Sequence, residues 1–129
     1  VQFIGNFISG SPIQSTLLLI LIVCTVSIFL TEIMSNVALV SVFIPITFII
    51  AEGFGLNELQ LAIPLTLGAS CAFMFPIATP PNAIVFSSNL ISIKQMAKAG
   101  ILINIVCLVL ISIYSYFFTE FFFVNIHKL

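Results

Sequence analysis

Charged residues are scarce in this chain of 129 residues. They make up 5% of it, whereas 61% is hydrophobic, and the mean hydropathy is +1.35. A soluble domain of this size needs a charged or polar surface, and so few ionisable side chains cannot form one. The composition therefore predicts that lipid surrounds most of the chain, as in an integral, multi-pass membrane protein.

Several residue types that carry chemistry are missing as well. The chain has no arginine and no aspartate, and His127 is its single histidine. The lack of an arginine cluster argues against a nucleic-acid partner. An intramembrane enzyme would need a serine–histidine pair, two aspartates or a set of zinc ligands. Because Cys24, Cys71 and Cys107 lack metal-binding spacing, we expect small core residues there, and no enzyme, cofactor or transition metal.

The first two apolar segments, 16–30 and 37–51, are short. Each offers about 14 or 15 apolar residues, whereas a membrane-spanning helix needs about 20. A single bent helix over both would be far longer than the hydrocarbon core is thick, at about 1.5 Å per residue. The sequence therefore predicts an all-α fold with a re-entrant helical hairpin over residues 15–52, its tip at 31–37.

The third segment, within residues 58–90, is interrupted by Pro80-Pro81 after an apolar run that ends at Ile77. Neither proline can continue a helix, yet apolar residues resume at once. We expect a proline-broken transmembrane helix, unwound at 78–81, with proline in the first turn of its second half. Unwound backbone at membrane depth must be buried by protein or line a cavity, so this break is a candidate site.

Residues 96–124 form the fourth segment, which we expect to be the last transmembrane helix. The connection before it carries Lys94 and Lys98, whereas the connection after the hairpin carries Glu52 and Glu58. The positive-inside rule therefore places the lysine-bearing loop in the cytoplasm and the C-terminal end outside.

Hydroxyl and amide side chains gather where the helices break. Unpaired carbonyls at a helix C-terminus coordinate cations, and unpaired N–H groups at an N-terminus hold anions. Neutral oxygens suit Na⁺, whereas a transition metal prefers histidine or cysteine. Secondary transporters build their sites from such breaks. The residues concerned are Thr31, Ser35, Asn36, Thr79 and Asn82.

Glu32 is the single acidic residue that we expect at membrane depth. An ionisable residue there suggests a function. Two interpretations stay open: a structural carboxylate that anchors the hairpin tip through hydrogen bonds, and a group that couples transport to protons.

Two motifs carry a family resemblance. Thr31-Glu32-x-x-Ser35-Asn36, followed by Ala38 and Pro45, resembles the second Ser-Asn-Thr hairpin of the divalent anion/sodium symporter (DASS) family. The run SCAFMFPIATPPNA at 70–83 resembles the broken-helix signature of that family even more closely. The motifs stand in the family's order and spacing, and the similarity covers nearly the whole chain.

The resemblance implies a homodimeric, elevator-type carrier built from two inverted repeats, of which this chain would be the second, in the C-terminal half. The chain begins with Val1 and shows no signal peptide, so we expect a missing N-terminal half in a longer chain. The implied function is sodium-coupled symport of di- or tricarboxylates such as succinate, malate or citrate. A bacterial inner membrane is the expected location.

The resemblance also implies site residues. Val37 stands where the family motif usually has threonine, so no hydroxyl reaches the substrate there. Proton coupling through Glu32, transport of an inorganic anion such as sulfate, and a non-transporting scaffold subunit are the alternatives. The implied sodium ligands are Thr31, Ser35, Asn36 and Ala78, and the implied substrate contacts are Asn36, Val37, Thr79 and Pro80.

Overall fold

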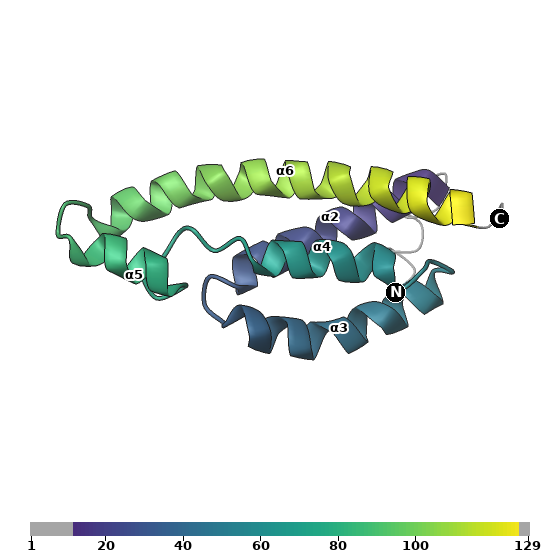
Figure 1. Ribbon diagram of the computed structural model, residues 1–129, viewed down its shortest axis with the longest axis horizontal. Helices are drawn as coiled ribbons and strands as arrows, with labels where there is room; N and C mark the ends of the chain where they lie inside the picture. The colour runs from purple at the N-terminus through teal and green to yellow at the C-terminus, as the bar shows by residue number, and fades with distance from the viewer. Residues whose placement is uncertain (1–11, 127–129) are drawn as a thin grey trace, which may run out of the picture.

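A computed structural model describes residues 12–126 and shows five helices and no strand within that range (Figure 1). His127 lies outside the described residues. The expectation of an all-α fold is confirmed. The helices are α2 (Pro12–Leu30), α3 (Asn36–Gly53), α4 (Leu59–Ala69), α5 (Pro80–Ser87) and α6 (Ile93–Ile126).

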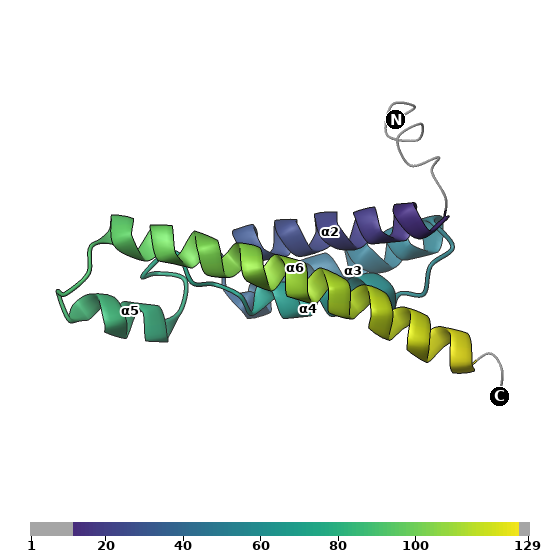
Figure 2. The ribbon, with the colours of Figure 1, turned by 90° about the horizontal axis from the view of Figure 1, so that it is seen from above.

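Helix α4 lies at the centre of the bundle. It packs against α2, α3 and α6, and α6 also packs against α2. Helices α2 and α3 run in opposite directions on either side of α4, and they contact α4 more than each other (Figures 1 and 2). The two arms of the hairpin therefore hold the first half of the broken helix between them.

The apolar core has two parts along α4. Leu19, Ile20, Ala51 and Leu61 form one cluster, toward the α3–α4 connection. The second cluster joins α3 to the later part of α4 and consists of Leu39, Leu65 and Ala69. Lipid tails are as apolar as these side chains, so close packing and polar contacts hold such helices together.

Helices α2 and α4 also share polar contacts. The Ser27 hydroxyl donates to the Leu65 carbonyl at 2.6 Å. A Cβ at Gly68 would lie 3.0 Å from Ser27 Oγ, so the glycine lets α2 approach closely. Small residues at helix contacts serve this purpose in membranes.

Helix α6 runs beside the whole broken helix, passing α5, the unwound segment and α4 in turn (Figure 1). Its inward face is buried and partly polar, whereas apolar side chains on its other faces are exposed. By length and composition, the ranges Asn36–Gly53 and Ile93–Phe122 could each cross a membrane. Up to residue 122, where the description of α6 side chains ends, its buried polar residues are Asn104, Ser112, Ser115 and Thr119.

The structure corrects the sequence-based helix lengths in two places. The hairpin arms are longer than expected: α2 has 19 residues because it begins at Pro12, and α3 has 18 because Asn36, Glu52 and Gly53 are helical too. The first half of the broken helix is shorter, since α4 ends at Ala69 instead of continuing to Ile77. Pro76 contributes, because its ring would clash with the preceding helical turn. Pro76 is therefore part of the break, not a kink within a helix.

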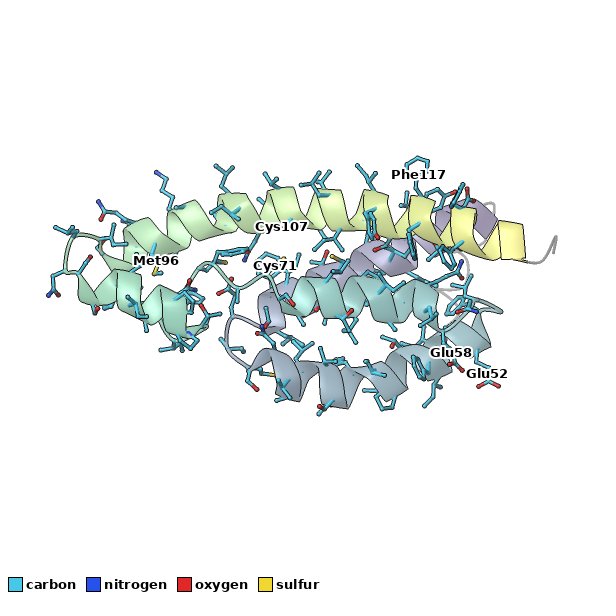
Figure 3. All side chains as sticks on the ribbon, in the orientation of Figure 1. Glu52, Glu58, Cys71, Met96, Cys107 and Phe117 are labelled. Carbon is cyan, nitrogen blue, oxygen red and sulfur yellow. The ribbon has the colours of Figure 1, made fainter. Side chains whose placement is uncertain are left out.

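The two ends of the molecule differ in charge, as the orientation argument requires. Lys94 and Lys98 lie in the first turns of α6. Glu52 and Glu58 lie at the opposite end of the long axis, beside the α3–α4 connection (Figure 3). Which end faces the cytoplasm stays a prediction.

Candidate functional site

The hairpin turn, defined here as residues 31–35, satisfies its own backbone. The Thr31 amide donates to the Ser27 carbonyl at 3.0 Å, and the Met34 amide donates to the Leu30 carbonyl at 3.0 Å. Ser35 caps α3, because its hydroxyl oxygen accepts from the Ala38 amide at 3.2 Å. An N-cap of this kind leaves the turn's other side chains free for different partners.

Thr31 is fully buried and joins the turn to the end of α4. Its Oγ1 lies 2.6 Å from the Ala69 carbonyl oxygen and 2.7 Å from Asn36 Oδ1. A hydroxyl carries one hydrogen, so it can donate to only one of these two oxygens. One of the two contacts therefore needs another donor, and the Asn36 amide supplies it if its oxygen and nitrogen are exchanged.

Glu32 is the other side chain of the turn that points inward, and it is 2% exposed. Its Oε1 accepts from the Phe73 amide at 2.9 Å and from the Met74 amide at 3.1 Å. Asn104 Nδ2 also donates to Oε1, at 2.7 Å, and Oε2 lies 3.1 Å from the Met74 amide. The expectation that Glu32 anchors the hairpin tip through hydrogen bonds agrees with these contacts.

Thr31 and Glu32 together replace a backbone hydrogen bond of α4. If the helix continued, the Phe73 amide would donate to the Ala69 carbonyl. Instead the Thr31 hydroxyl reaches that carbonyl, and the Glu32 carboxylate accepts from that amide. Two adjacent residues of the turn thus satisfy both halves of the missing bond, which allows α4 to end there without unpaired backbone groups.

The rest of the unwound segment, residues 70–79, is stabilised from α5. Asn82 Nδ2 donates to the Ala72 carbonyl at 2.8 Å and to the Phe75 carbonyl at 3.0 Å. Thr79 is the N-cap of α5, since its Oγ1 accepts from the Asn82 amide at 3.4 Å. Pro80 and Pro81 start α5 and have no N–H, so this helix start offers an anion few backbone donors.

The predicted site residues fall into two groups. Thr31 and Asn36 are in contact, and Ser35 lies between them in sequence but uses its hydroxyl as a cap. Ala78 lies in the break, where its amide donates to the Phe75 carbonyl at 3.2 Å. None of the hydrogen bonds among the described residues joins Ala78 or Thr79 to the turn; Glu32 connects the turn to the break earlier in that segment, at Phe73 and Met74.

Three contributors to the site escaped the sequence analysis. Ala69 offers a carbonyl that no side-chain pattern marks, and Asn82 was noted for its amide but not as an anchor for the break. Asn104 is the third: an amide in a long apolar helix indicates a bond across helices, and here that bond goes to Glu32 of the site.

The start of α3 supplies backbone donors. The first helical residues, Asn36 and Val37, have amides with no partner inside the helix. Val37 is 77% exposed, and its side chain offers no hydroxyl. A helix start with open amides favours an anion, and the neutral oxygens beside it favour a cation.

A polar hairpin turn that meets a proline-broken helix beside a long apolar helix is typical of secondary membrane transporters. Residues 1–124 match the family described as the sodium:sulfate symporter transmembrane region. The chain belongs to this family, the divalent anion/sodium symporters, and is part of an integral membrane protein.

Relatives from bacteria and animals agree with this assignment. A protein of Haemophilus influenzae named as an uncharacterized transporter is 48% identical over 98 residues, which are 76% of this chain and 21% of that protein. The sodium-dependent high-affinity dicarboxylate transporter 2 of Caenorhabditis elegans is 44% identical over 121 residues, covering 94% of this chain and 20% of that protein. The sodium-dependent dicarboxylate transporter SdcS of Staphylococcus saprophyticus is 40% identical over 103 residues, covering 80% and 20%.

The chain spans about a fifth of the length of these relatives. The family and its named relatives are transporters, in agreement with the expectation that this chain is not an enzyme.

Proposed function

We propose that the complete protein is a sodium-coupled symporter that carries di- or tricarboxylates, such as succinate, malate or citrate, across a membrane. The observation that carries the proposal is that Asn36 Oδ1 and the Ala69 carbonyl oxygen both lie within 2.7 Å of Thr31 Oγ1, beside the buried Glu32 carboxylate. Two of the named relatives are sodium-dependent dicarboxylate transporters, which supports both the ion and the substrate class.

Sodium binds at the hairpin turn in this proposal. Thr31 and Asn36 supply side-chain oxygens, and Ser35 and Ala78 complete the site from the turn and the break. The Ala69 carbonyl joins this set because Thr31 already contacts it. Neutral oxygens bind a monovalent cation without trapping it, and Glu32, next to Thr31, supplies a compensating negative charge.

One carboxylate of the substrate binds between α3 and α5. The open amides of Asn36 and Val37 donate to it from the start of α3. Thr79 Oγ1 accepts from the Asn82 amide and so keeps its own hydrogen to donate. Pro80 contributes a surface without an N–H, and Val37 contributes its amide in place of a threonine hydroxyl.

The hairpin is re-entrant in this proposal, and the chain is the second inverted repeat of a homodimeric elevator-type carrier. The contact between Glu32 and Asn104 supports the re-entrant geometry, because Asn104 lies in the first half of α6 and the turn therefore ends partway along it. The relatives come from bacteria and animals, so a bacterial inner membrane stays a prediction.

Sulfate is the second candidate substrate, because the family description names it. Proton coupling through Glu32 has less support, since the three groups that contact its carboxylate are N–H donors, which require an acceptor oxygen.

Uptake into proteoliposomes tests the proposal. The complete protein is given labelled succinate under a sodium gradient, a potassium gradient or a proton gradient, and Asn36→Ala is compared with wild type. Asn57→Ala is the matched control, because Asn57 is exposed in the α3–α4 connection and caps only the Leu59 amide.

We expect sodium-dependent uptake that Asn36→Ala abolishes and Asn57→Ala retains. Uptake driven by the proton gradient alone would contradict sodium coupling. If sulfate inhibited the uptake of labelled succinate more strongly than unlabelled succinate does, sulfate would replace carboxylates as the proposed substrate class.

A further inference from the structure

Asn104 is a buried polar residue of α6 that has no part in the proposed sodium or substrate contacts. It is 1% exposed, and its Nδ2 donates to Glu32 Oε1 at 2.7 Å. We propose that Asn104 is a positioning residue: by holding Glu32, it fixes the unwound segment 70–79 against the hairpin turn and thereby sets the sodium affinity. This inference rests on the proposed function.

The backbone of the unwound segment lies between Glu32 and α6. Gly100 is one turn before Asn104 on the same face of α6. A Cβ at Gly100 would overlap the Phe73 carbonyl oxygen and lie 2.6 Å from Met74 Cα. Glu32, in the hairpin turn, accepts from the amides of Phe73 and Met74 on the other side of this segment. Helix α6 therefore acts on this segment in two ways: Gly100 admits its backbone, and Asn104 holds the carboxylate that binds its amides.

A displacement of the Glu32 carboxylate would reach both parts of the proposed sodium site, the one in the turn and the one in the break. Thr31, next to Glu32, contributes the central hydroxyl, and the amides that Glu32 binds lie a few residues before Ala78. A hydrogen bond to a charged group is among the stronger ones, so losing the Asn104 donor lets the carboxylate move or recruit water. Asn104 itself contacts neither proposed ligand set.

A merely structural role makes a different prediction. Amides often link membrane helices without any effect on a binding site. If Asn104 only stabilises the bundle, its loss lowers the amount of folded protein and leaves the sodium dependence of the remaining transporter unchanged. The concentration of sodium at half-maximal uptake separates the two roles, because it does not depend on how much protein is folded.

The experiment compares Asn104→Leu with Thr119→Val in the complete protein. Thr119 is a matched control: it is buried on the same face of α6 and bonds only to carbonyls of its own helix, at Ser115 and Tyr116. Two measurements are made on monodisperse protein: the sodium dependence of succinate uptake, and hydrogen exchange of peptides that cover residues 70–79. If Asn104→Leu does not yield folded protein, Asn104→Ala replaces it with the same expectations.

We expect Asn104→Leu to raise the half-saturating sodium concentration about tenfold, with a maximal rate within about twofold of wild type. The amides of Phe73 and Met74 should exchange faster, and Thr119→Val should change neither measurement. In a Glu32→Gln background, Asn104→Leu should add little, because it acts through the carboxylate.

Faster exchange with unchanged sodium dependence would overturn the positioning role and leave a structural one. Unchanged exchange would overturn the link between Asn104 and the unwound segment. If wild-type protein shows no sodium-dependent uptake, the proposed function fails and the positioning role fails with it. If wild-type uptake depends on sodium but Asn104→Leu does not raise the half-saturating sodium concentration, only the positioning role fails.

Discussion

Two of the connections between helices, the hairpin turn and the unwound segment, are stabilised in different ways. The hairpin turn at 31–35 is short, and backbone bonds within the turn and α2, plus the Ser35 cap, satisfy it. The unwound segment at 70–79 is longer, and side chains from elsewhere satisfy it: Thr31 and Glu32 from the turn, and Asn82 from α5.

The difference explains how one connection can depend on the other. A turn that needs no outside partner can direct its buried side chains to a second segment that does. The open break then has a defined conformation only while the turn is in place. Damage to the turn's inward side chains should therefore affect the break, whereas damage to the turn's own cap should stay local.

Loss of the Glu32 carboxylate should have the largest effect. Glu32→Ala leaves the amides of Phe73 and Met74 and the Asn104 side chain without their acceptor. Orphaned buried donors cost about 1–3 kcal/mol each, so we expect a loss on the order of 3 kcal/mol or more in the stability of the purified complete protein. Thermal unfolding in detergent measures it. Glu52→Ala, at an exposed position, should change stability by less than about 0.5 kcal/mol, and equal losses would contradict the comparison.

Crowding the break from α6 should come second. Gly100→Ala places a methyl group against the Phe73 carbonyl and Met74 Cα, both of them backbone atoms that cannot rotate away. Overpacking of this kind costs typically about 1–3 kcal/mol, and the same unfolding measurement detects it. Gly53→Ala is the control, because a Cβ there meets nothing within 4 Å. If both substitutions behave alike, the break does not press against α6.

The sequence predicts the turn better than the break, for a physical reason. Polar residues between two apolar runs mark a turn, and Pro80-Pro81 marks the start of α5, because both signals are local. The end of α4 at Ala69 has no such signal beside it: the residues that follow are mostly apolar and suit a helix until Pro76. Glu32, about 40 positions earlier in the chain, accepts from the Phe73 amide that a continued helix would use. Gly100 packs against the same segment from α6, and Asn104 acts on it from α6 through Glu32.

Loss of the Asn82 side chain should have a moderate effect, confined to the break. Asn82→Ala removes the donors to the carbonyls of Ala72 and Phe75, at a cost of about 1–2 kcal/mol. We expect faster hydrogen exchange in peptides that cover 70–79 and unchanged exchange in those that cover 31–35. Asn57→Ala, which removes a bond in an exposed loop, should leave both regions unchanged. Equal acceleration in the turn would show that the two connections form one unit instead of a self-sufficient turn and a dependent break.

Loss of the Ser35 cap should be the smallest effect. Ser35→Ala removes the acceptor of the Ala38 amide at an exposed helix start, where water can take its place, so we expect a loss of about 1 kcal/mol or less. Ser35→Asp keeps an acceptor at the cap and should recover most of this loss. The amides of 70–79 should exchange as in wild type in both variants, because the inward contacts of Thr31 and Glu32 do not pass through Ser35. Faster exchange in the break of Ser35→Ala would mean that the cap sets the direction of the turn's inward side chains, and the turn would then be less independent than its backbone bonds indicate.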